Sequence, residues 1–369
     1  MAAVSTHRVK LREAHFEDYQ AIAALEGSHE LVSKPLNDWR RLWSGNPCYE
    51  ELGPRWPIGW VLQDGERIVG CSCNIPLRYV FRGKKLVVAS GRGWVVDDAY
   101  RGYAALLGDE YFNQENVDLF LNNTVNGKAA GLITALGSMR VPAGDWSEAA
   151  FAITEHRGFA ESALRIKQIP QPRLLSYPVG LALSLKDRLT GNSLPKADID
   201  VALQHDFDQR FDTFWENLSH RSNDLLAVRS REVLRWHFGA VLDTDGLWVL
   251  TAARGGNIDA YAVFQRRDEP QYGLKRIRMV DFQACDRHDQ YCAALVQRAF
   301  DECRAQGIHV LEHVGCNLAK TNVFDRFAPY RRKLAGWSFF YLTNDEELAR
   351  QLADPEAWAP SSYDGDASL

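Results

Sequence analysis

The stretch "VVDDAYRGYAALLGDEYF", residues 95–112, reads as a β-branched strand, an acidic turn containing Tyr-Arg-Gly, and the start of a helix. A strand that turns directly into a helix leaves several backbone N–H groups unpaired at the positive end of the helix dipole. Such a space suits an anion, most often a phosphate. The alternative is an ordinary strand-to-helix connection in which Gly102 only supplies a permissive turn.

The length and composition of the chain limit its architecture and its partners. A chain of 369 residues exceeds what one hydrophobic core usually serves, so two domains are expected. Hydrophobic residues at 46% and charged residues at 25% are ordinary values for a globular protein. A formal net charge of −5 argues against nucleic acid as the main partner, because that affinity depends on basic residues. Small molecules or proteins are the expected partners.

The cysteines and apolar runs indicate where the protein resides. The seven cysteines include no paired C-x-x-C spacing, so we expect reduced thiols and no metal site. The N-terminus lacks an apolar core of signal-peptide length, and the longest weakly polar runs are too short to span a bilayer. We therefore expect a cytoplasmic protein with no membrane partner.

Several sequence patterns recur in one order at a nearly constant offset of about 190 residues. The matches are "WVL" at 60–62 and 248–250, "AALL" at 104–107 with "AALV" at 293–296, and Asn126 and Asn317, which each end an apolar strand. Each match alone is close to chance, but matches in a common order are what two copies of one domain leave. The chain is therefore expected to contain a duplicated domain.

The first copy shows its elements most clearly. An Asp-Gly turn between two strand-like runs, residues 59–77, predicts a hairpin. A strand, a turn, a helix and a further strand then follow, and such a segment normally closes as a right-handed crossover between parallel neighbours. The expected elements are a strand at 8–13, a helix at 16–29, strands at 84–96 and 117–126, and a helix at 104–114. The fold class is α/β with a mixed sheet.

The copies and the segments around them divide the chain into four parts. We expect an N-terminal domain at 1–170, a helical connector with prolines near both ends at 171–197, a C-terminal domain at 198–345 and an acidic tail at 346–369. The tail is either an extended arm that packs Trp358 and Tyr363 or a frayed end.

With these elements in place, the chain resembles the GNAT superfamily of acyl-CoA-dependent N-acyltransferases, in a tandem form with degenerate motifs. In that family a turn written R/Q-x-x-G-x-G/A holds the CoA pyrophosphate. "VVDDAYRGYAAL" at 95–106 is similar to it: Arg101 and Gly102 stand at the family's Arg-Gly, while Ala104 and Leu106 occupy the later glycine positions. The resemblance implies two tandem GNAT-like domains, with acetyl-CoA or another acyl-CoA as co-substrate.

The resemblance also implies which residues hold the co-substrate. The thioester carbonyl would meet a backbone N–H near Trp94 or Val95, and the pyrophosphate would lie on the turn. The implied cofactor-binding residues are Trp94, Val95, Val96, Arg101, Gly102, Tyr103, Ala104 and Ala105.

The family's next helix often reads N-x-x-A-x-x-x-Y-x-x-x-G-F, with a tyrosine that protonates the departing thiolate. "NGKAAGLITALGS" at 126–138 is similar to it, but Ile133 stands at the tyrosine position, and "NLAKTNVF" at 317–324 places Phe324 there in the second copy. The acid would then be water, the amine itself, Tyr103 or Tyr111. Asn122 and Asn123 would position the amine or close a strand end.

In the second copy, Gln290 and Tyr291 replace the Arg-Gly pair, so we expect poorer phosphate binding there. Asp281 lies within an apolar strand, at the position that the repeat aligns with Arg92. Two interpretations of Asp281 stay open: a base that serves the amine, or a structural ion pair with Arg276, Arg278 or Arg298. Glu312 and His313 follow in the next strand as candidate substrate-binding residues, although a lone histidine is more often structural.

The expected function is transfer of an acyl group, most simply acetyl, from acyl-CoA to an amine of a small molecule or peptide by direct attack. The tyrosines missing from both copies favour one alternative, a non-catalytic tandem domain that senses CoA or binds a protein. A second alternative, an aminoacyl-tRNA-dependent transferase of related fold, would need a basic face that the charge balance does not indicate.

Overall fold

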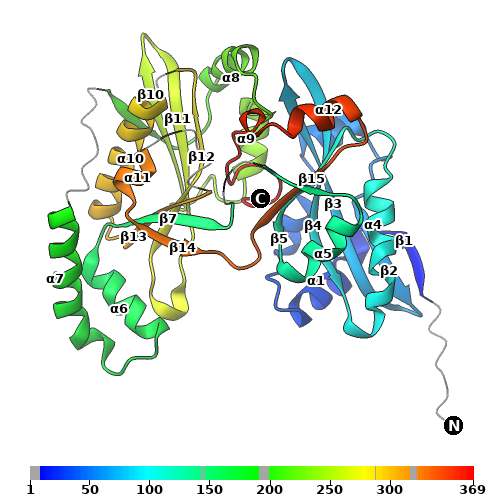
Figure 1. Ribbon diagram of the computed structural model, residues 1–369, viewed down its shortest axis with the longest axis horizontal. Helices are drawn as coiled ribbons and strands as arrows, with labels where there is room; N and C mark the ends of the chain where they lie inside the picture. The colour runs from blue at the N-terminus through cyan, green and yellow to red at the C-terminus, as the bar shows by residue number, and fades with distance from the viewer. Residues whose placement is uncertain are drawn as a thin grey trace.

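The structure is a computed structural model that describes residues 9–142, 144, 146–190, 199–286, 288–315, 321 and 323–369. Two mixed sheets lie side by side, each with its own helices (Figure 1). The first sheet has the order β1-β2-β3-β4-β5-β15-β6, and β9 pairs with β3. Its strands are β1 (Lys10–Glu13), β2 (Gly59–Asp64), β3 (Arg67–Phe81), β4 (Lys84–Val96), β5 (Leu119–Val125), β15 (Ser338–Leu342), β6 (Met139–Arg140) and β9 (Leu226–Ala227).

The second sheet repeats the plan of the first. Its order is β8-β10-β11-β12-β13-β7-β14, and among the described strands of both sheets only the fourth and fifth, β4–β5 and β12–β13, pair in parallel. The strands are β8 (Val201–Gln204), β10 (Leu247–Arg254), β11 (Asn257–Arg266), β12 (Arg276–Ala284), β13 (Val310–Val314), β7 (Glu148–Ile153) and β14 (Tyr330–Lys333). The mixed α/β class and the tandem duplication predicted from the sequence are confirmed.

Each sheet contains a strand from the other half of the chain. Strand β7, which precedes the connector, pairs with β13, with Ile153 opposite Val310. Strand β15, near the end of the second copy, pairs with β5, with Tyr341 opposite Leu121. The expected domain boundaries at residues 170 and 198 follow the order of the chain. The sheets do not respect these boundaries, because each contains one strand from beyond them. The exchanged strands β15 and β7 thereby pair with the backbone N–H and C=O groups at the edges of β5 and β13.

The helices follow the predicted order. The expected helix at 16–29 is a 3-10 turn followed by α1, and the helix expected at 104–114 is α4. The α-helices are α1 (Tyr19–Ser28), α2 (Leu36–Arg40), α3 (Pro47–Leu52), α4 (Ala104–Phe112), α5 (Gly127–Ala135), α6 (His156–Ile166), α7 (Pro172–Thr190), α8 (Arg210–Arg221), α9 (Arg231–Phe238), α10 (His288–Ala305), α11 (Val323–Phe327) and α12 (Glu346–Leu352). The 3-10 helices are η1 (Phe16–Asp18), η2 (Asp98–Tyr103), η3 (Pro270–Tyr272) and η5 (Pro355–Ala357).

One hydrophobic cluster runs through both halves. It joins Trp39 and Trp43 of the first half to Phe211 and Tyr261 of the second. Aromatic rings bury large areas, so this shared cluster ties the two halves into one unit. Among the described helices, none has the length and apolarity needed to cross a bilayer.

The C-terminal tail lies between the halves (Figure 1), and most of its residues from 357 onward are buried. Trp358 packs against Phe339 and Tyr341, and Tyr363 is tilted over the ring of His237. Of the two expectations for this segment, the packed arm is confirmed. The tail brings two buried acidic side chains, Asp364 and Asp366, into the space between the sheets.

Candidate functional site

The parallel strands β4 and β5 separate partway along their length. Their pairing runs only from Val88 opposite Leu119 to Ser90 opposite Leu121. Beyond this point β4 continues to Val96, and β5 turns its other edge to β15. The strands therefore open into a V whose inner backbone edges face each other without pairing.

A β-bulge lies on β4 at the opening. Cys71 of β3 stands opposite Val95 and Cys73 opposite Arg92, so Gly93 and Trp94 together face one residue. Gly93 has a φ of 63°, and a Cβ there would lie 2.6 Å from a carboxylate oxygen of Glu26. Glycine is needed for both reasons. A bulge bends its strand and changes the direction of the backbone groups, and this bulge lies beside the opening.

Four buried polar atoms around the opening have no hydrogen-bond partner among the described residues. They are Ser90 Oγ, Arg92 Nε, Trp94 Nε1 and Asn122 Nδ2. Buried polar atoms in folded proteins are nearly always paired. Since these four belong to the two separating strands, the opening is suited to a polar ligand that would supply the missing partners.

The turn predicted to hold the pyrophosphate forms η2 and leads directly into α4. The eight expected cofactor-binding residues follow one another from the end of β4, through η2, to the first turn of α4. Arg101 is exposed and pairs with Asp98 across 2.6 Å. A Cβ on Gly102 would meet no atom within 4 Å, and Tyr103 is 37% exposed. The turn is thus open to solvent at its middle.

Tyr111, expected as a candidate acid, is fully buried at the base of the V. Its hydroxyl donates to Ala89 O at 2.8 Å and to Leu121 O at 3.2 Å, so it bridges β4 and β5. Burial raises its pKa well above the ordinary value. The two backbone carbonyls share the one hydrogen of the hydroxyl, and this geometry favours a brace between the strands.

The two adjacent asparagines of β5 have different surroundings. Asn122 faces β4: a Cβ on Gly91 would lie 2.2 Å from its Oδ1. Asn123 instead holds the tail, because its side-chain amide donates to Asp364 O and accepts from the backbone N–H of Asp366 at 3.4 Å. Asn122 is thus part of the opening, and Asn123 connects the opening to the tail.

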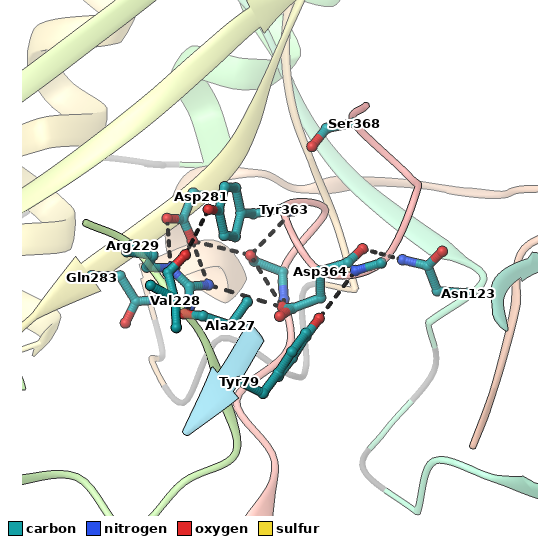
Figure 2. Close-up of polar contacts among 12 residues, drawn as sticks. Tyr79, Asn123, Ala227, Val228, Arg229, Asp281, Gln283, Tyr363, Asp364 and Ser368 are labelled. Carbon is teal, nitrogen blue, oxygen red and sulfur yellow. Dashed lines mark hydrogen bonds and ion pairs between the residues drawn. The ribbon is translucent and has the colours of Figure 1, made fainter. Parts of the chain in front are cut away.

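Asp281 lies at the centre of a buried network between the halves (Figure 2). Its carboxylate accepts from Arg229 Nε at 2.9 Å and Nη2 at 3.1 Å, from the Tyr261 hydroxyl at 2.7 Å and from Ser361 Oγ at 3.0 Å. The side chains of Asp281 and Arg229 are both 0% exposed. Asp364 of the tail extends the network, with its Oδ2 4.0 Å from Arg229 Nη2.

The arginine partners expected for Asp281 are wrong. Arg276 and Arg278 lie beside Glu312, and Arg298 pairs with Glu302 one turn along α10. Arg276 and Arg278 are two residues apart on β12, and both lie next to Glu312 of the adjacent strand β13, which is their partner in place of Asp281. The actual partner, Arg229, comes from the segment before α9 and had no local signal.

Glu312 and His313 point to opposite faces of β13. Glu312 is buried and accepts from Arg278 Nε at 2.7 Å and Arg332 Nη2 at 2.8 Å. Burial pushes its pKa upward, but the arginines around it outweigh that effect and hold the pKa below its ordinary value. His313 stacks on Phe324 with ring centroids 4.3 Å apart, and burial lowers its pKa to about 4. Asn317 lies outside the described residues.

The second half has a cavity of about 190 Å³ near the corresponding end of its parallel pair. Its lining includes Gln283, Cys285, His288, His313 and Ser361. The tail therefore forms part of the wall of this cavity. Among the described residues, no group of three or more His, Cys, Asp or Glu side chains could hold a metal ion.

Sequence reasoning missed two carboxylates near the opening. Glu26 of α1 is 3% exposed and lies against Gly93. Its spacing of four residues from buried Ile22 could have indicated a carboxylate on an inward-facing helix stripe. Asp366 of the tail accepts from Thr124 Oγ1 at 3.1 Å, with its other oxygen 3.6 Å from Arg92 Nη1. No local signal could have found Asp366, since its partners are more than 240 residues away.

The charges at this place come from both halves. Burial is the main cause that lowers the pKa of Lys34 to about 8, and the cations of Arg92 and Arg267 lower it further. Burial raises the pKa of Asp366, while Arg92 opposes the shift. Titratable groups with shifted pKa values thus gather where the open ends of β4 and β5 meet the tail.

Comparisons with known proteins identify the fold. No protein-family model matches the sequence, and no curated protein sequence matches it. Among solved structures, a GCN5-related N-acetyltransferase from Anabaena variabilis aligns with a TM-score of 0.55 and 11% identity, covering 92% of this chain and 73% of that one. Saccharomyces cerevisiae N-myristoyltransferase with bound myristoyl-CoA aligns with a TM-score of 0.52 and 15% identity, covering 91% and 82%. This chain therefore has the tandem GNAT fold that GCN5-related N-acetyltransferases and N-myristoyltransferase share.

Proposed function

We propose that the protein is an N-acyltransferase that moves an acyl group from acyl-CoA to an amine of a small molecule or peptide. The observation that carries the proposal is the set of four unpartnered polar atoms in the opening of β4 and β5, beside the Gly93 bulge. The myristoyl-CoA bound by the yeast enzyme of the same fold supports acyl-CoA as the donor class.

In this proposal the co-substrate follows the path from β4 to α4. The pyrophosphate meets backbone N–H groups of η2 and the first turn of α4, where the helix dipole favours negative charge. The thioester carbonyl accepts from a backbone N–H at Trp94 or Val95, which stabilises the oxyanion that forms on attack. The amine nitrogen attacks the carbonyl carbon, the C–S bond breaks, and the electron pair leaves with the thiolate.

Asp366 is our candidate for the base that takes the proton from the amine. It lies between Thr124 of β5 and Arg92 of β4, at the open ends of both strands. Its raised pKa suits a group that must accept a proton near neutral pH. An amine must lose a proton before or during attack, because an ammonium has no free electron pair.

The thiolate needs a proton after it leaves. Ile133 at the family's tyrosine position is buried with Val125 and Phe340 and has no proton to give. We propose that the proton comes from water or the attacking amine. Tyr103 remains a second donor, because it is partly exposed at the junction of η2 and α4.

Calorimetric titration of acetyl-CoA and longer acyl-CoAs tests the binding part. We expect one site per chain, and a β-branched side chain in Gly102→Val should weaken binding by at least about tenfold by crowding the phosphates. Gly27→Val is the matched control, since a Cβ at that exposed helix position also meets no atom within 4 Å. Two sites per chain, or equal binding by Gly102→Val and the control, would contradict the assignment.

Release of free thiol in the presence of a panel of amines tests the transfer part. Asp366→Asn should lower turnover by about a hundredfold or more while acyl-CoA affinity stays unchanged, as expected for a lost base. Binding of acyl-CoA with no transfer to any amine or peptide would instead support the non-catalytic alternative.

A further inference from the structure

Helix α7 has its apolar residues on the outside. It packs through a small and polar face on which Ser176 and Gly180 are buried. A Cβ on Gly180 would lie 3.0 Å from Cα of Arg157 in α6, so the two helices approach closely. A surface helix normally turns its leucines toward the core. Here most of the leucines lie on the opposite, exposed face, and Leu183 alone of them is partly buried beside Gly180.

The outward leucines form one continuous stripe. Leu174 is 66% exposed, Tyr177 57%, Leu181 72%, Leu185 56% and Leu189 78%. Their spacing of three or four residues places all five on one side of the helix over its whole length. Scattered exposed leucines need no explanation, whereas a contiguous stripe marks an interaction surface. The helix lies at the outer edge of the second half, away from the first (Figure 1).

Basic residues flank the stripe on both sides. On a helical projection, Arg173 lies beside one border and Lys186 beside the other, while Arg188 lies within the stripe near its C-terminal end. Residues 156–190 contain six basic and two acidic residues, although the whole chain has a net charge of −5. Of these two acids, Asp187 contacts His156 and Tyr330, and Glu161 contacts Arg165 and Arg173. The positive charge around the stripe is therefore in excess.

We propose that α7 lies flat on a lipid bilayer that contains anionic phospholipids, with its leucine stripe among the acyl chains and its basic flanks at the headgroups. An apolar face bordered by Lys and Arg is the pattern of an interfacial helix, whose long basic side chains reach back to the lipid phosphates. A second copy of this chain is a poorer occupant, because pairing two such stripes brings the basic flanks of both copies together.

The surface binds the bilayer without crossing it. No described helix is apolar enough to span, and the charged residues of α7 would have to enter the hydrocarbon. The expectation of no membrane partner rested on the lack of a spanning segment, and an interfacial helix is compatible with that lack. The inference does not depend on the proposed function.

Sedimentation of the full chain with vesicles tests it. We expect binding to phosphatidylcholine vesicles that contain phosphatidylglycerol to be at least about tenfold tighter than to phosphatidylcholine alone, and to weaken as salt is raised. Leu181→Glu with Leu185→Glu should remove binding. Leu31→Glu with Val32→Glu is the matched control: it makes the same charge change at exposed apolar positions, 41% and 89% exposed, on another surface.

Circular dichroism of each variant verifies that it is folded, as expected for changes at exposed positions. Equal binding by the α7 variant and the control, or no binding to either vesicle, would overturn the proposal. Light scattering provides a further check: a dimer of the unmodified protein that Leu181→Glu dissociates would assign the stripe to a second copy and reject the bilayer.

Discussion

At the scale of single residues, Asp281 shows how type and position leave a role open until the partners are seen. A carboxylate in an apolar strand could serve equally well as a catalytic base or as one partner of a structural ion pair. Its contacts with Arg229, Tyr261 and Ser361 use both of its oxygens. The geometry therefore favours the structural interpretation, in which Asp281 fixes the segment before α9 and the tail against β12.

Asp281→Asn should lower the free energy of unfolding by about 3–5 kcal/mol, because it leaves the buried charge of Arg229 without its partner. Chemical denaturation measures this change. Asp208→Asn, which breaks the partly exposed pair with Arg210, should cost less than about 1 kcal/mol and serves as the control. A stable Asp281→Asn variant that loses turnover but still binds acyl-CoA would restore the catalytic interpretation.

His313 should make stability depend on pH. Because burial lowers its pKa from the ordinary 6.5 to about 4, the unfolded chain takes up a proton before the folded protein does. The contribution of neutral His313 to the free energy of unfolding is fully present above pH 6.5. It is lost as the pH drops from 6.5 toward 4, which lowers the free energy of unfolding by about 3 kcal/mol in total.

His313→Gln removes this proton uptake, so its stability should fall less steeply than that of the unmodified protein over the same range. Denaturation curves at several pH values measure the difference, and His205→Gln at an exposed position is the control. If the free energy of unfolding of His313→Gln falls with pH as steeply as that of the unmodified protein, His313 is not the source of the pH dependence.

At the scale of elements, the opening between β4 and β5 depends on what holds the strands together just below it. The Tyr111 hydroxyl reaches a carbonyl on each strand where their pairing ends. The bulge at Gly93 then turns β4 away while β15 holds β5. The Tyr111 hydroxyl, the bulge at Gly93 and the pairing of β5 with β15 together produce the V.

Tyr111→Phe should lower the free energy of unfolding by about 1–2 kcal/mol, as expected for the loss of a buried hydroxyl that donates to two carbonyls. Acyl-CoA affinity should fall with it, because the opening loses its brace. Denaturation and calorimetric titration measure the two effects. If Tyr111 were the acid, turnover would fall at unchanged stability and affinity, which thiol release under saturating acyl-CoA would reveal.

At the scale of the whole molecule, the two halves cannot be separated cleanly. Each sheet lacks a strand without the other half, since β7 pairs with β13 and β15 with β5. The hydrophobic cluster also passes between them, and the tail binds residues of both. The two halves of the chain therefore fold together as one unit.

The full chain should unfold in one transition, with a calorimetric enthalpy equal to the van't Hoff enthalpy. Fragments cut within 191–197 should fail to fold alone, because each leaves an edge strand unpaired and an apolar surface exposed. Mixing the two fragments should restore structure, as circular dichroism can follow. Two resolved transitions, or a folded isolated fragment, would contradict this prediction.

Much of the fold could be predicted, but less of the site. The hairpin at 59–77 and the strand-turn-helix at 95–112 were read from short-range patterns, and the structure has them there. The eight residues expected along the acyl-CoA path all fall within residues 94–105, so their proximity follows directly. Glu26 carried a weak signal, and Asp366 carried none.

The sequence by itself determined the elements, their order and the duplication, because hydrophobic periodicity, turn residues and repeated patterns act over short distances along the chain. Only the tertiary structure decided the exchange of β7 and β15, the pairing of Asp281 with Arg229, and the place of the tail across β4 and β5. These contacts join residues from about fifty to more than two hundred positions apart. Long-range contacts of this kind are set by how whole sheets satisfy their edges and share one core, and they leave no period in the sequence.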